Sequence, residues 1–332
     1  MATLYLERSS MEIEVENETI VLRENGTLLQ RIPCRLVDRI VVTADLSLQV
    51  GALRRLGRAG IGVFLPASRS GADVLLWPAE TRAGTRKLGQ ARIYMDARQR
   101  QAWAARVVRG KVQGQMGVLR ALESRRPEKG FELAKGREQL SGALGRLRGG
   151  ALEIPSLLGV EGAASAAYFQ AFGCAFAPGL HFRGRTRRPP RDPVNAVLSL
   201  GYTLLYHGAL EAILAAGLEP SFGFLHEPAP GRSALACDLM EPFRPKVDWE
   251  IWKMWNERVL RAESFSVNQG ACLLGKAGRR NFYGAFEAPM DAMRGDLRSV
   301  CTAFGRAAEI AAAVQVCTRE PWAGSEWREE AE

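Results

Sequence analysis

The sequence predicts an α+β protein: a small β-rich amino-terminal domain, sandwich-like with one helix, is followed by a larger all-α domain. Apolar residues alternate in the strand period up to about residue 77, and from residue 87 they recur at helical spacings. The length of 332 residues also exceeds that of a typical single core. We therefore expect a β-rich domain over 1–79, a linker over 80–86 and a helical domain over 87–332.

Turn residues divide the amino-terminal domain into short strands. Glu24-Asn-Gly26 is typical of a tight turn between two strands. The single helix has apolar residues three apart, with Asp45 or Ser47 as its cap and an end near Gly60. Strands are expected at 11–15, 19–22, 39–42, 61–65 and 73–77.

The second domain holds one segment that resembles a membrane span. Residues 194–218 are almost continuously apolar and long enough to cross a bilayer. However, Asn195, His207 and Glu211 lie within this segment and would be costly in hydrocarbon. The sequence therefore favours a buried central helix, and we expect the chain to end in a helix and a mobile acidic tail.

The charge balance indicates the class of partner, and the cysteines indicate the redox compartment. Lys and Arg exceed Asp and Glu by 9, which favours phosphate-rich polymers but is equally compatible with an arginine-rich surface. The six cysteines show no metal-ligand spacing, and the amino terminus lacks an export signal, so we expect reduced thiols and a cytoplasmic protein.

A basic loop precedes the central helix. Its prolines prevent helix formation, and phosphate contact is favoured over a merely solvated surface loop. The arginines of this loop are Arg183, Arg185, Arg187, Arg188 and Arg191.

Several polar residues stand in apolar surroundings. Glu161 lies in a helix opened by Pro155; alone it would most simply face solvent, but it could also pair with a base or bind a cation. His226 belongs to a segment too rich in Gly and Pro for a helix, and is therefore expected on a turn. In isolation, such a histidine is most often structural.

Two carboxylates follow His226. Asp238 and Glu241 are three residues apart, so a helical turn places them on one face, with Arg244 at the next interval. A surface ion-pair ladder is the alternative to a functional site, although the neighbouring side chains are apolar. Pro242 excludes an ordinary helix interior here.

The central helix carries a polar stripe with steps of four, three and four residues. The stripe either forms a buried hydrogen-bond network or lines an active site or DNA channel. Its members are Asn195, Ser199, Tyr202 and Tyr206.

Four ordered blocks resemble the signature motifs of the CRISPR adaptation integrase family, the first Cas protein family. The resemblance extends to about residue 280 and implies a dimerising amino-terminal domain and a helical catalytic domain. The blocks are 157–169, 188–202, 223–226 and 238–245.

The resemblance also implies a metal site. Glu161, His226 and Glu241 match the family's ligands, and Asp238 matches the acid beside them. Two carboxylates and an imidazole suit Mg²⁺ or Mn²⁺, which would neutralise phosphate charge during transesterification. In that reaction, a protospacer 3′-hydroxyl attacks the repeat boundary, and water in its place gives nuclease activity. The loop arginines and Arg244 would hold DNA phosphates.

The implied partners are double-stranded DNA (protospacer and repeat), a second copy of the chain and a small ferredoxin-like subunit, with no membrane. Two alternatives stay open. A stand-alone nuclease for branched DNA would use the same residues without a partner, whereas in a DNA-binding scaffold the three ligands would only satisfy one another.

Overall fold

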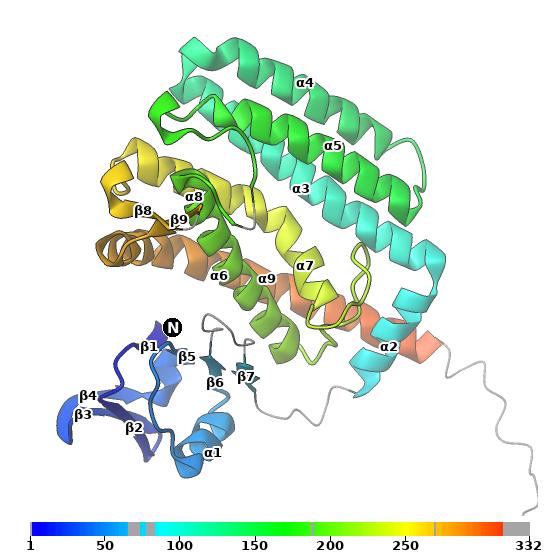
Figure 1. Ribbon diagram of the computed structural model, residues 1–332. Coiled ribbons are helices and arrows are strands. Elements are labelled where there is room, and N and C mark those ends of the chain that lie inside the picture. Colours follow the sequence, from blue (N-terminus) through cyan, green and yellow to red (C-terminus); the bar gives the residue numbers. More distant parts are fainter. Residues whose placement is uncertain (1, 66–73, 78–83, 187–188, 269, 315–332) are drawn as a thin grey trace, which may run out of the picture. The chain divides into compact units, whose positions relative to one another are not determined.

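The chain divides into two compact units, Met1–Thr81 and Arg82–Glu332 (Figure 1). The structure is a computed structural model and describes residues 2–65, 74–77, 84–186, 189–268 and 270–314. The division falls within the predicted 80–86 linker. The predicted acidic tail lies outside the described residues.

The first unit contains two sheets that share one core. Its four-stranded sheet has the order β1-β5-β6-β7, with β7 antiparallel to β6 and the other pairs parallel. The second sheet is an antiparallel β2-β3-β4 meander. Leu6 and Ile40 from one sheet, Ile13 and Ile20 from the other, and Leu56 from the helix are buried together. The elements are β1 Ala2–Leu6, β2 Met11–Glu16, β3 Thr19–Glu24, β4 Thr27–Pro33, β5 Val37–Val42, α1 Val50–Arg58, β6 Gly62–Leu65 and β7 Val74–Leu76.

Among the described residues of this unit, the β-rich character and the single α-helix are confirmed. Asn25 and Gly26 adopt positive φ angles of 50° and 76°, which the tight turn between β3 and β4 requires. The predicted cap of the helix is wrong. Gln49 is the residue before α1, and its side chain makes no capping hydrogen bond. Neither Asp45 nor Ser47 therefore caps the amino-terminal end of the helix.

The second unit is mainly helical, as predicted, but it is not wholly α because it contains a β-hairpin. The first helix begins at Gly84, inside the predicted linker. The predicted helical run is interrupted at Asp96, whose side chain accepts a hydrogen bond from the Gln99 N–H at 3.0 Å and begins a new helix. The elements are α2 Gly84–Met95, α3 Ala97–Arg125, α4 Gly130–Arg146, α5 Ile154–Gly173, α6 Pro193–Ala215, α7 Ala234–Met240, α8 Arg244–Asn256, β8 Phe265–Asn268, β9 Ala271–Leu274 and α9 Lys276–Val314.

Helix α6 is the predicted central helix. By length and composition alone it could cross a membrane, but more than half of its most apolar window is buried within the protein. It packs against α7, α8 and α9. This environment is the one expected of a core helix.

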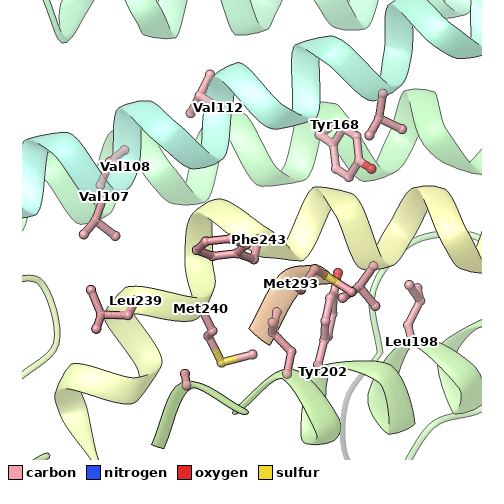
Figure 2. Close-up of a cluster of buried hydrophobic side chains, with 14 of the residues drawn as sticks. Val107, Val108, Val112, Tyr168, Leu198, Tyr202, Leu239, Met240, Phe243 and Met293 are labelled. Carbon is pink, nitrogen blue, oxygen red and sulfur yellow. The ribbon is translucent and has the colours of Figure 1, made fainter. Parts of the chain in front are cut away.

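A second packing layer places α3 beside α4 and α5 (Figure 1). Helix α3 also contacts the 3₁₀ turn Glu241–Phe243 that joins α7 to α8. Figure 2 shows Val107 of α3 on the side of the helix facing Leu239, whereas Val112 points away from Phe243. The contact between α3 and the 3₁₀ turn holds the helix against the segment that carries Glu241.

The contact between α2 and α9 depends on a glycine. A Cβ at Gly89 would lie 1.7 Å from the carbonyl oxygen of Ala308, so Gly89→Ala should force the helices apart. We expect a loss of about 2 kcal/mol and a thermal midpoint lower by about 4–8 °C. Gly142 is the control, because a Cβ there meets nothing within 4 Å. Gly142→Ala should leave the midpoint unchanged or raise it, as calorimetry of both variants can check.

Candidate active site

Two carboxylates meet at one lysine. Glu161 on α5 and Glu241 on the 3₁₀ turn both form ion pairs with the Nζ atom of Lys111 on α3, the second at 2.6 Å. Lys111 and Glu241 are buried, and the Glu161 side chain is 21% exposed. From its sequence surroundings, Glu161 could face solvent, pair with a base or bind a cation; in this structure it pairs with a base.

The approach of α3 to the 3₁₀ turn makes this arrangement possible. Lys111 follows Gly110, where a Cβ would lie only 3.2 Å from Pro242. Pro242 is the second residue of the 3₁₀ turn Glu241–Phe243, which agrees with the prediction that an ordinary helix interior is excluded there. The carboxylates are therefore held by the close packing of three elements.

Glu241 is held in its ionised form. Burial alone would raise its pKa, but Arg244 and Lys111 outweigh that effect and lower the pKa below the ordinary value. The Nε atom of Arg244 donates to Oε1 of Glu241 at 2.9 Å, and its guanidinium lies 4.5 Å from the ring centroid of Tyr202. Glu241 and Arg244, which are three residues apart in the sequence, therefore form an ion pair, and this pair is buried.

Asp238 organises the turn that carries His226. This fully buried carboxylate accepts hydrogen bonds from the backbone N–H groups of Phe224, Leu225 and His226, the last two at 2.9 and 3.1 Å. It also contacts Nδ1 of His226 at 2.5 Å. The imidazole is therefore fixed through Nδ1, which leaves Nε2 to act as ligand or base.

The ring of His226 is also close enough to Glu241 to help lower the pKa of that carboxyl. His226 lies outside helix and strand, as predicted. Asp238 and Glu241 do not form a surface ladder: each is buried and each has its own partners.

A cavity of about 610 Å³ shares Lys111 with the carboxylate pair. It has three arginines in its wall, and Phe169 and Tyr202 contribute aromatic surface. Cationic groups together with aromatic faces are suited to a phosphate and a nucleotide base. The lining residues are Lys111, Gln115, Ser165, Ala166, Phe169, Gln170, Arg183, Gly184, Arg185, Tyr202, Arg244 and Asp248.

The basic loop contributes to the cavity through Arg183 and Arg185. Arg185 is anchored on α6, because its guanidinium donates to Oδ1 of Asn195 at 2.7 Å and to Oγ of Ser199 at 3.0 Å. Arg191 is exposed outside the cavity lining. Arg187 and Arg188 lie outside the described residues.

The residues of the polar stripe on α6 divide between hydrogen bonds to other segments and the wall of the cavity. Asn195 and Ser199 hold the basic loop, and Tyr202 lines the cavity. Tyr206 lies away from the cavity, where its hydroxyl accepts a hydrogen bond from the Ser233 N–H at 3.2 Å.

A buried acid at the cavity wall was not predicted from the sequence. Asp248 on α8 accepts hydrogen bonds from the hydroxyls of Tyr168, at 2.9 Å, and Tyr202. Burial raises the pKa of Asp248 to about 6, despite the two hydroxyls and nearby arginines. Only the tertiary packing of α5, α6 and α8 brings these three groups together.

The raised pKa of Asp248 predicts a pH-dependent stability. Between pH 4 and 6 the folded state retains a proton that the unfolded state has lost, so stability should fall as pH rises. The increase in the pKa of Asp248 from 3.8 to about 6 corresponds to about 3 kcal/mol. Denaturant unfolding at pH 4, 5, 6 and 7 should show this loss in the wild type and a shallower one in Asp248→Asn. Equal slopes would contradict the assignment.

The three predicted metal ligands are only partly brought together. Across the described parts of the chain, no three carboxylate, imidazole or thiol groups form a ready metal-ligand cluster. However, a cation already lies between Glu161 and Glu241, namely the ammonium of Lys111. Two carboxylate donors and a nearby imidazole are compatible in chemistry with Mg²⁺ or Mn²⁺.

Comparison with known proteins gives a consistent assignment. The sequence profile of the family described as CRISPR associated protein Cas1 matches residues 4–288. A protein of Thermodesulfovibrio yellowstonii, CRISPR-associated endonuclease Cas1 1, is 30% identical over 309 residues, covering 92% of this chain and 96% of the relative.

Two solved structures share the fold. A casposase bound to integration product has a TM-score of 0.75 at 23% identity and covers 92% of this chain and 91% of its own. A chain of a Cas6-RT-Cas1–Cas2 complex has a TM-score of 0.70 at 22% identity, covering 93% of this chain and 35% of that one.

These matches place the protein in the class of CRISPR-associated proteins. Within that class, the chain belongs to the Cas1 family, as the four sequence blocks predicted.

Proposed function

We propose that this protein is a metal-dependent DNA integrase and endonuclease that inserts protospacer DNA into a CRISPR array by 3′-hydroxyl transesterification. The observation that carries the proposal is the pair of carboxylates around one cation, beside an arginine-lined cavity. The endonuclease name of the 30% identical relative supports the same class of reaction.

The residues of this chain have separable roles in the proposed reaction. Arg183, Arg185 and Arg244 attract DNA phosphates into the cavity and help to neutralise the scissile group. Glu161 and Glu241 hold Mg²⁺ or Mn²⁺, with His226 as the third ligand. When bound, the ion supplies charge neutralisation at the phosphate and lowers the pKa of the attacking group. Asp238 keeps His226 oriented through Nδ1.

We also propose the partners named by the resemblance: a second copy of the chain bound through the β-rich unit, and a small ferredoxin-like subunit. A chain with the same fold is part of a Cas6-RT-Cas1–Cas2 complex, which supports a partner subunit. The second copy of the chain and the ferredoxin-like fold of the subunit follow from the resemblance alone. The casposase bound to integration product supports DNA joining as the reaction to be tested.

The deciding experiment is a strand-joining assay. Purified protein with Mn²⁺, alone and with the small subunit, is mixed with a repeat-containing duplex and a labelled 3′-hydroxyl strand. A joined product whose formation stops when the 3′-hydroxyl is removed supports the integrase. Cutting of branched DNA without joining under either condition identifies a stand-alone nuclease, and DNA binding with no turnover identifies a scaffold.

A further inference from the structure

Lys111 occupies the position that a metal ion between Glu161 and Glu241 would take. Its side chain is only 6% exposed, and its single ammonium group contacts both carboxylates. A divalent ion cannot share that position with a positively charged nitrogen because the two repel strongly at short distance. Binding of the metal between these carboxylates therefore requires the ammonium to leave.

The structure offers a destination for the displaced ammonium. Gln115 is one helical turn further along α3, and its Oε1 atom is buried and lacks a hydrogen-bond partner among the described residues. Among the residues that the structure describes, its Nε2 atom has only a long contact with Oγ of Ser165, at 3.5 Å. Both Lys111 and Gln115 line the cavity, and a lysine has four rotatable side-chain bonds. The ammonium can thus turn from the carboxylates into the cavity while α3 stays in place.

On this basis, we infer that Lys111 has two states. Without metal, it holds the two carboxylates together as their counter-ion. With metal, its ammonium moves into the cavity toward Gln115 and contacts the DNA phosphate. The inference rests on the proposed function for the identity of the ligand in the second state.

Replacement of the Lys111 ammonium by a divalent ion changes the net charge of the site. Without metal, Lys111 and Arg244 cancel the charges of Glu161 and Glu241, so this group is neutral. A divalent ion raises the net charge of these four side chains and the ion to +2, which favours binding of a phosphate in the cavity. The metal would therefore increase DNA affinity through charge and through release of the lysine, as well as by direct contact.

The test compares Lys111→Met and Lys111→Gln with the wild type and with Lys135→Met, which changes an exposed lysine on α4. Isothermal titration with Mn²⁺ alone should show binding at least about tenfold tighter in both Lys111 variants, because no ammonium must be displaced. The metal-free Lys111 variants should also unfold at a lower temperature than Lys135→Met. Unchanged or weaker Mn²⁺ binding in a folded Lys111 variant overturns the inference.

A second measurement needs no variant and so holds even if neither Lys111 substitution folds. A crystal structure of the wild type grown with Mn²⁺ should show Nζ of Lys111 withdrawn from both carboxylates and pointing into the cavity. An ion bound elsewhere, with Nζ still between Glu161 and Glu241, overturns the inference. Absence of strand joining, with the ammonium displaced by Mn²⁺, would instead count against the proposed function alone.

Discussion

Glu161→Gln should lower strand joining and DNA cutting by about a thousandfold, whereas DNA affinity in the absence of metal should not fall. The substitution keeps the size of the side chain but removes one of two carboxylates that meet at a single cation. Loss of a charged group that acts on the transition state costs a factor of about 10² to 10³ or more in rate. Phosphate attraction should persist, because the arginines of the cavity are untouched.

The control for this variant is Glu153→Gln. Glu153 is exposed and directly precedes the same helix, so Glu153→Gln makes the same chemical change outside the site. Turnover is measured in the strand-joining assay, and affinity is measured by fluorescence anisotropy of labelled DNA without divalent ions. If Glu161→Gln joins strands as fast as Glu153→Gln, the carboxylate pair is not the reaction centre.

The sequence was sufficient to predict the main elements of the fold, whereas the meeting of Glu161 and Glu241 was expected from the family resemblance alone. Strand-period alternation and helical spacing separate the two units, and Pro155 and Pro242 locate the helix of Glu161 and the turn of Glu241. Those signals are local, since each depends on residues within a few positions of one another. The β8–β9 hairpin was missed because a hairpin of four-residue strands has too short an apolar alternation to stand out between long helices.

The groups that complete the site could not be predicted in this way. Lys111 occurs in a helix whose other polar residues are mostly arginine and glutamine, so the spacing pattern assigns it to a solvated face. Its burial results from packing of α3 against the turn after α7, a contact across more than a hundred residues. Asp248 is similar: its partners Tyr168 and Tyr202 come from two other helices. One signal was available, since Gly110 and Gly114 flank Lys111 and favour close helix packing.

Asp238→Ala should destabilise the second unit by about 3–5 kcal/mol and remove most of the activity. The Asp238 carboxylate is fully buried and satisfies three backbone N–H groups and the Nδ1 atom of His226. Alanine leaves these donors without an acceptor, and each unsatisfied buried group costs about 1–3 kcal/mol. The turn should therefore lose its shape and His226 its orientation. Chemical denaturation of the metal-free protein measures the first effect.

A control variant elsewhere and a conservative variant of Asp238 separate the effect on stability from the effect on the reaction. Asp296→Ala removes an exposed acid paired with Lys246 on the same unit, and should change stability by less than about 1 kcal/mol. Asp238→Asn retains one acceptor oxygen and the side-chain size, so it should fold more stably than Asp238→Ala. However, its uncharged amide holds the imidazole less firmly, and we expect strand joining to fall at least tenfold. A stable Asp238→Asn with wild-type turnover would show that the carboxylate shapes the turn without orienting His226 for the reaction.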